Sequence, residues 1–288
     1  MKRWGMATLL CKTAARLRII GITICVMISS LPSHAEDVLS QSTAARDLQS
    51  IIDAKRLRVA VTRFDLPSFH AHRPDGTLVG AEIEIAQQIG QALGVRVEFI
   101  EDADTFDAVV DLVATGRADI GISKLSQTYR RLQRVRFSEP YVTLRHALLF
   151  NRAAIAREAN GRPPAAVLRR YHGRIGVIAA SAYVDFAKAN FPEAIVVKQR
   201  TWDDAIASLL AGQVEAIYRD EFEIRRIVKI SPALNVQFGT AAIIDQNALL
   251  SIAICDTCSK LQELINYHLV RTKNNITLKT LLDTDTGE

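Results

Sequence analysis

The sequence predicts an α/β protein in which mainly parallel sheets are flanked by helices and arranged in two successive units. Short apolar runs typical of buried strands alternate with longer segments whose apolar residues recur at helical spacing. The alternation begins again after residue 172, which indicates a second unit. Hydrophobic residues make up 49% of the 288 residues, so the chain has enough apolar side chains for two cores.

The first unit begins with the apolar run LRVAV at residues 57–61, which predicts a buried strand. Residues 81–94 then predict an amphipathic helix, because their apolar residues recur at helical spacing and the segment ends on Gly94. The further elements expected in this unit are a strand at 95–100, a helix at 105–116 and a strand at 118–123.

The second unit repeats the same alternation. Its expected elements are strands at 173–179, 194–199 and 214–220 and helices at 182–191 and 202–213. The polar segment 151–165 carries two prolines and is predicted to separate the units. In open α/β sheets the binding crevice lies at the carboxyl ends of the strands, so the informative side chains are expected directly after the strands.

The first 35 residues have the composition of a secretory signal peptide that is cleaved after Ala35. They contain basic residues and no acid, followed by an apolar run at 19–31 and by small residues before the cleavage point. The apolar run is shorter than the ~20 residues that a membrane-spanning helix needs. A retained N-terminal anchor is the alternative, and residues 36–50 are expected to form an N-terminal extension.

Charge argues against a nucleic-acid partner. Five basic residues lie in the predicted signal peptide, and the rest of the chain balances its remaining basic residues against 31 acidic ones. The mature protein is therefore expected to be neutral, whereas binding to a phosphate backbone relies on an excess of Lys and Arg. The arginine-rich segment TYRRLQRVRFSEPY at 128–141 is accordingly expected to serve a small anion.

Cys255 and Cys258 are the two cysteines that follow the predicted signal peptide. In an exported protein the sequence CDTC predicts a local disulfide. A redox motif is the alternative, but a thioredoxin-like pattern does not surround the pair, and a zinc site would need two further ligands.

Several segments in a fixed order resemble the bacterial extracellular solute-binding proteins of family 3, the substrate-binding components of polar amino-acid ABC transporters. They are LRVAV, DGTLVGAEIEIAQQIGQALGV, TGRADIGIS, TYRRLQRVRFSEPY, GRIGVIAAS and GQVEAIYRD, and the resemblance runs from about residue 50 to about residue 270. It implies a periplasmic protein, a two-lobed clamshell that closes on an amino acid and delivers it to a membrane permease. It also implies a monomer without a cofactor.

The resemblance further implies that the second lobe is inserted into the first. The first lobe would comprise residues 51–143 and 247–288, and the second lobe residues 144–246. The chain would cross a hinge twice, near Thr143–His146 and near Asp245–Asn247.

Arg131 corresponds to the arginine that binds the ligand α-carboxylate in the family, and a planar guanidinium suits two carboxylate oxygens. Ser126 and Thr128 would add hydrogen bonds to the same group. The alternative for Arg131 is a solvated surface charge like those of its neighbours. Asp220 corresponds to the acid that pairs with the ligand α-ammonium, although it could equally cap the helix that follows it.

Ser181 matches the position whose backbone N–H groups contact the carboxylate from the far lobe, although Ala180 replaces the usual glycine there. Phe69 and Phe106 match positions where family members stack rings on the ligand, or else they belong to the core. Both residues are therefore candidates for the wall of the side-chain pocket.

Arg63 and Lys124 suggest an acidic ligand such as glutamate or aspartate. Each would add a cation near the crevice beyond the one that the α-carboxylate needs. The alternative is that Arg63 pairs with Asp65 or Glu82 and that Lys124 points to solvent. Arg219 is expected to turn away from Asp220, because neighbouring side chains in a strand alternate.

Two other functions share this fold. Exported cyclohexadienyl or arogenate dehydratases would need an acid or base in the crevice, for which Glu139, His70 and Glu221 are candidates. Receptor sensor modules are the second alternative. The histidines lack a metal-ligand spacing, so neither a metal nor catalysis is expected, and a binding protein is the favoured interpretation.

Overall fold

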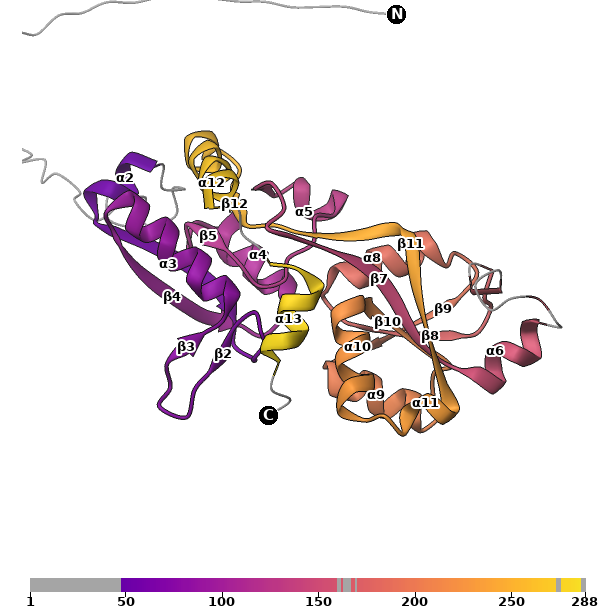
Figure 1. The fold of residues 1–288 in the computed structure, drawn as a ribbon. Helices are drawn as coiled ribbons and strands as arrows, with labels where there is room; N and C mark the ends of the chain where they lie inside the picture. Colours follow the sequence, from indigo (N-terminus) through magenta and orange to yellow (C-terminus); the bar gives the residue numbers. More distant parts are fainter. Residues whose placement is uncertain (1–47, 160–161, 163–166, 169, 273–275, 286–288) are drawn as a thin grey trace, which may run out of the picture.

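The computed structural model describes residues 48–159, 162, 167–168, 170–272 and 276–285 (Figure 1). The predicted signal peptide and most of the predicted N-terminal extension lie outside the described residues. Within the described ranges, no helix combines the length and the apolar character that crossing a bilayer requires. The elements pack on two five-stranded sheets, and we call each sheet with its helices a lobe.

The first lobe contains a sheet with the strand order β4-β1-β5-β12-β6. Its strands are β1 (Arg56–Thr62), β4 (Arg96–Ala103), β5 (Ile120–Gly121), β6 (Val135–Phe137) and β12 (Ala253–Cys255). Strand β1 runs parallel to both β4 and β5, as the alternation of strands and helices predicts. Strand β12 arrives from the end of the chain and pairs antiparallel with β5 and β6, so the sheet is mixed.

The helices of the first lobe are α2 (Leu48–Asp53), α3 (Ala81–Leu93), α4 (Phe106–Ala114), α5 (Tyr129–Leu132), α12 (Ser259–Thr272) and α13 (Leu278–Thr284), and a hairpin joins β2 (Ala71–His72) to β3 (Leu78–Val79). Helix α3 ends where the sequence predicts, because Gly94 takes up a left-handed conformation with φ 67°. The first turn of α4 is capped by the Thr105 hydroxyl, which accepts from the backbone N–H of Ala108.

The second lobe contains a sheet with the strand order β11-β7-β10-β8-β9. Its strands are β7 (Val142–Asn151), β8 (Arg174–Ile178), β9 (Ile195–Gln199), β10 (Ala216–Asp220) and β11 (Phe238–Leu250), and its helices are α6 (Arg152–Ala159), α8 (Ala182–Asn190), α9 (Trp202–Leu210), α10 (Glu221–Ile230) and α11 (Leu234–Gln237). Strands β8, β9 and β10 are parallel, whereas β7 pairs antiparallel with both β10 and β11.

The long strands β7 and β11 connect the two lobes (Figure 1). On β7, Leu144 packs in the core of the first lobe, and Ala147 packs in a core of the second lobe. The pairing of the two strands is irregular between Ile243 and Asn247. These observations support the predicted hinge segments, and the lobe boundaries at 143/144 and 246/247 stay a prediction.

The interpretation of residues 151–165 as a separator between the units is wrong. Residue 151 ends β7, and residues 152–159 form helix α6 inside the second lobe. Its polar residues lie on the exposed face, while Ala154, Ile155 and Ala159 are buried. Polar composition here reflects an amphipathic surface helix, and the chain passes between the lobes earlier, along β7.

Cys255 and Cys258 form the local disulfide that the sequence predicts, and both residues are buried. The bridge links the end of β12 to the start of α12. It therefore fixes a turn on the first lobe.

Candidate ligand-binding site

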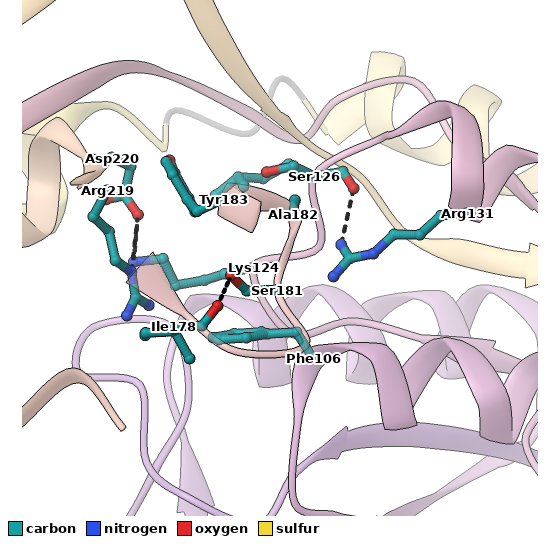
Figure 2. Close-up of a pocket in the computed structure, with 11 residues that line it drawn as sticks. Phe106, Lys124, Ser126, Arg131, Ile178, Ser181, Ala182, Tyr183, Arg219 and Asp220 are labelled. Atoms are coloured by element: carbon teal, nitrogen blue, oxygen red, sulfur yellow. Dashed lines mark hydrogen bonds and ion pairs between the residues drawn. The ribbon is translucent and has the colours of Figure 1, made fainter. Parts of the chain in front are cut away.

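A pocket lies between the two lobes, close to the carboxyl ends of β5, β8 and β10 (Figure 2). This is the place that the open α/β architecture predicts. The pocket is lined by Phe106, Lys124, Ser126, Arg131, Ile178, Ser181, Ala182, Tyr183, Arg219, Asp220 and Leu250. In Figure 2, Arg131 approaches from one side, and Arg219 and Asp220 lie on the other.

Arg131 lines the pocket from the short helix α5 and is almost completely buried. Its Nε and Nη2 atoms donate to Oδ1 of Asp107 at 3.1 and 2.9 Å, and Nη1 donates to the backbone carbonyl of Ser126 at 2.9 Å. Burial lowers the pKa of Arg131, and the Asp107 carboxylate offsets part of this shift. A buried guanidinium at the wall of a pocket is a suitable group for a carboxylate ligand.

The other three arginines of the segment 128–141 do not line the pocket. Arg130 joins Asp107 to Asp185 of the second lobe, with distances of 2.9 and 3.2 Å. Arg134 pairs with Asp111 at the surface, and Arg136 is exposed. Arg131 is therefore the member of the cluster that is placed to meet a ligand.

Asp220 is both a helix cap and a lining residue of the pocket. Its Oδ1 atom accepts from the backbone N–H of Glu223 at 3.2 Å and so caps α10. Its Oδ2 atom lies 3.3 Å from Nζ of Lys124 and 3.7 Å from Nε of Arg219. Asp220 thus caps the helix and lines the pocket, and its pairing with a ligand ammonium stays a prediction.

Lys124 is buried and does not point to solvent. Its Nζ atom donates to Oε1 of Glu223 at 2.7 Å and lies 4.5 Å from the ring centre of Phe69. Burial alone would raise the pKa of Glu223, but the charges of Lys124 and Arg219 overcome this effect and lower it to about 2. The lysine therefore belongs to a buried group of alternating charges.

Arg219 lines the pocket together with Asp220, so the expectation that strand alternation turns it away is wrong. Its guanidinium lies over the rings of Phe106 and Trp202, at 5.5 and 5.1 Å from their centres. Asp220 is the last residue of β10, and strand alternation no longer decides where a long side chain ends there. The aromatic rings hold the Arg219 cation next to the pocket.

Ser181 lines the pocket at the start of α8, but its hydroxyl is already used. It donates to the carbonyl of Ile178 at 2.7 Å and does not cap the helix. Ala180 adopts φ 49°, the left-handed conformation in which glycine is usually found. Its carbonyl accepts from the backbone N–H of Asp107 at 3.1 Å, so the two lobes touch at this point.

Three predicted site residues lie outside the pocket wall. Thr128 caps α5 by accepting from the backbone N–H of Arg131, and it therefore positions that arginine. Phe69 is fully buried and packs edge-on against Phe222 of the second lobe. Arg63 is exposed and pairs with Asp104 at 2.7 Å, so it adds no cation to the pocket. The remaining six, Phe106, Lys124, Ser126, Arg131, Ser181 and Asp220, line it.

The candidate groups for catalysis are also absent from the pocket lining. His70 is buried between Glu82 and Thr62, and Glu221 pairs with Arg145. The backbone N–H of Glu139 bonds to a residue of α12. Among the residues that the structure describes, no group of acids, histidines and cysteines is placed to hold a metal ion.

Sequence reasoning missed several contributors to the site, and two of them carry polar groups that matter for it. Tyr183 lines the pocket from the first turn of α8, and Glu223 holds Lys124 from behind. Glu223 follows Asp220 by three residues on α10, a spacing that places both acids on one side of the helix start. This spacing is the sequence signal from which Glu223 could have been predicted as a second acid near the site.

Comparison with known proteins gives the same family as the resemblance of the sequence motifs. The profile described as bacterial extracellular solute-binding proteins, family 3, matches residues 57–284. The histidine-binding periplasmic protein of Salmonella typhimurium is 24% identical over 212 residues, covering 73% of this chain and 77% of that protein.

Solved structures of amino-acid-binding proteins share the fold of this chain. An arginine-bound amino-acid ABC transporter substrate-binding protein from Streptococcus pneumoniae superposes with a TM-score of 0.66 and 25% identity, covering 83% of this chain and 98% of that one. An ancestral amino-acid-binding protein, described as a precursor of cyclohexadienyl dehydratase, gives a TM-score of 0.63 with 23% identity and the same coverage. The fold is thus that of the two-lobed periplasmic binding proteins.

Proposed function

Because the chain belongs to the bacterial extracellular solute-binding proteins of family 3, we propose that it captures a small polar solute bearing a carboxylate, an amino acid or a close analogue of one. It would deliver this solute to the membrane permease of an ABC transporter. We further propose that it works in the periplasm, as a monomer and without a cofactor. Its similarity to a periplasmic amino-acid-binding protein and to an ABC transporter substrate-binding protein supports the transport role.

The observation that carries this proposal is the buried guanidinium of Arg131 at the wall of a pocket between two lobes. Three hydrogen bonds orient it, and Thr128 holds its backbone, so the cation is fixed before a ligand arrives. A pre-oriented arginine recognises a carboxylate through two parallel hydrogen bonds. Closure of the lobes would then enclose the solute, as in hinge-type binding proteins.

The pocket also supports selection against cationic side chains. Histidine and arginine are the ligands named for several relatives, but here Arg219 is held at the pocket wall by two aromatic rings. A second cation would meet like charge there, whereas a neutral polar or acidic side chain would not. The preference for a polar or acidic solute therefore depends on Arg219 and not on Arg63, which lies outside the pocket.

Binding without turnover is the function we favour over catalysis. Glu139, His70 and Glu221 are absent from the pocket lining, which leaves the dehydratase interpretation without its expected acid or base. The likeness to a dehydratase precursor concerns the fold and a protein that is itself described as amino-acid-binding. A turnover assay on arogenate and prephenate provides the direct check.

The test is isothermal titration calorimetry of the purified protein with a panel of amino acids and their deaminated analogues. We expect saturable binding of at least one carboxylate solute with one site per chain. Failure of every compound to bind, or turnover of arogenate or prephenate, would contradict the proposal. The corresponding amides, in which the carboxylate is blocked, should fail to bind and serve as the control.

A further inference from the structure

Lys124 places an ammonium group inside a site that has the chemistry of an ammonium receptor. Its Nζ atom lies 2.7 Å from Oε1 of Glu223 and 3.3 Å from Oδ2 of Asp220. The ring centres of Phe69 and Phe222 lie 4.5 and 5.0 Å from the same nitrogen. Two carboxylates and two aromatic rings are the groups that recognise a ligand ammonium, and here the chain's own lysine occupies them.

Asp220 is the one acidic residue among the lining residues of the pocket. Its Oδ1 atom caps α10, and its Oδ2 atom faces Lys124 and Arg219. A ligand ammonium in this pocket would therefore compete with two buried cations for a carboxylate that is already engaged. The other charged residues of the lining, Lys124, Arg131 and Arg219, are all cations and would repel it.

Lys124 is also held in place through its backbone. It adopts φ 47°, and its N–H donates to Oε1 of Glu82 at 2.6 Å. Glu82 is fully buried and is itself fixed by His70 at 2.8 Å and by the hydroxyl of Tyr141. The hydrogen bond to Glu82 supports the left-handed backbone conformation of Lys124. This conformation directs the ammonium towards Asp220.

We propose that the solute of this protein carries a carboxylate but no α-ammonium group, so that it is a 2-oxo, 2-hydroxy or related carboxylic acid, with Lys124 standing where the amino group of an amino acid would lie. This inference rests on the proposed function, because it needs Arg131 to receive the carboxylate. It refines that function by fixing the class of solute.

The first experiment compares matched compounds on the wild-type protein by calorimetry. The sets are glutamate, 2-oxoglutarate and 2-hydroxyglutarate; alanine, pyruvate and lactate; and phenylalanine, phenylpyruvate and phenyllactate. Within the set that binds, the oxo or hydroxy acid should bind about 100-fold more tightly than the amino acid, because displacing one partner of a buried charged pair is costly. Equal or tighter binding of the amino acid would overturn the inference and leave the proposed function standing.

The second experiment removes the internal ammonium. Lys124→Met removes the ammonium from Asp220 and Glu223 and leaves only Arg219 beside both of them, so the variant should gain affinity for the amino acid and lose it for the deaminated acid. Lys260→Met is the matched control, because Lys260 is an exposed residue that pairs with Glu263, and it should keep the wild-type preference. An unchanged preference in a folded Lys124→Met protein would contradict the inference.

Different results would contradict the proposed function and the inference about the class of solute. If no compound of any set binds, the proposed function fails and the inference falls with it. If Lys124→Met does not fold, the comparison of matched compounds on the wild-type protein still decides the inference alone.

Discussion

The ammonium of Lys124 lies 2.7 Å from the carboxylate of Glu223 and thereby joins a loop of the first lobe to the first turn of α10 in the second. Further contacts join the lobes nearby: the backbone N–H of Asp107 donates to the carbonyl of Ala180, and Phe69 packs against Phe222. The two lobes are thus in contact around the pocket. Opening would require separating these buried groups.

Replacing Arg131 by alanine should abolish measurable binding. The side chain is the buried cation placed to receive the carboxylate, and removing one partner of a buried charged pair costs about 3–5 kcal/mol. Titration calorimetry with the tightest solute of the panel measures this loss. Arg134→Ala is the control, because Arg134 pairs with Asp111 at the surface and should retain wild-type affinity. Retained binding in Arg131→Ala would contradict the assignment.

Binding should compact the molecule. Closure around the solute adds contacts to those that already join the lobes, so the radius of gyration from small-angle X-ray scattering should fall at saturating solute. Arg130→Ala removes the bridge between Asp107 and Asp185 and should enlarge the unliganded particle. Arg134→Ala provides the comparison, since its side chain does not reach the second lobe. An unchanged radius on saturation would argue against hinge closure.

Arg219 should set the selectivity for the side chain of the solute. Arg219→Ala removes the cation held over Phe106 and Trp202, so cationic compounds should gain about tenfold or more in affinity relative to acidic ones. Arg63→Ala should leave this ratio unchanged, because Arg63 is exposed and pairs with Asp104. A competition assay of glutamate and aspartate against arginine and glutamine reads out both variants. Tight arginine binding by the wild type would rule out this role.

Much of the site could be predicted from the sequence because its motifs resemble those of family 3. The resemblance indicated Arg131, Ser126 and Asp220, and all three line the pocket. The roles of Arg219 and Lys124 could not be predicted in the same way. Their conformations depend on partners that other parts of the fold bring close, such as Glu223, which is 99 positions from Lys124.

The resemblance placed hinge segments within β7 and β11, but sequence reasoning did not predict that these segments form strands. Strand β7 pairs with β11, and the two lie about a hundred residues apart in the chain. No local turn signal links such segments, and the mixed segment VTLRHALLF at 142–150 alone does not distinguish a strand from a helix. The polar residues at 152–159 led to the wrong prediction of a separator between the units, because they lie on the exposed side of α6.

Stability should fall in acid through Glu223. Lys124 and Arg219 hold the pKa of this carboxyl below its ordinary value of 4.5 despite burial. A folded-state pKa below the unfolded one stabilises the protein fully above pH 4.5, and this contribution is lost as the pH falls towards 2. Thermal unfolding between pH 3 and 7 should show a smaller decline in Glu223→Gln than in the wild type. Glu263→Gln, at an exposed pair, should follow the wild type; an identical decline in Glu223→Gln would contradict the assignment.

Glu82 should support both the stability of the first lobe and the placement of Lys124. Its carboxylate is fully buried and accepts from the backbone N–H of Lys124, from His70 and from the hydroxyl of Tyr141. Burial, together with the charge of Glu82, raises the pKa of Tyr141 and keeps this hydroxyl a donor. In Glu82→Gln one acceptor oxygen is replaced by an NH₂ group. The donors that faced this oxygen then lose their acceptor.

Each donor left unpaired in the interior costs about 1–3 kcal/mol, so Glu82→Gln should lower the free energy of unfolding by about 3 kcal/mol. Chemical denaturation followed by circular dichroism measures the change. Glu84→Gln is the matched control, because Glu84 occupies the same first turn of α3 but is exposed. Without its anchor, Lys124 should also leave the left-handed conformation, and the affinity for the solute should fall with the stability. A stable Glu82→Gln protein with wild-type binding would show that Lys124 needs no support from Glu82.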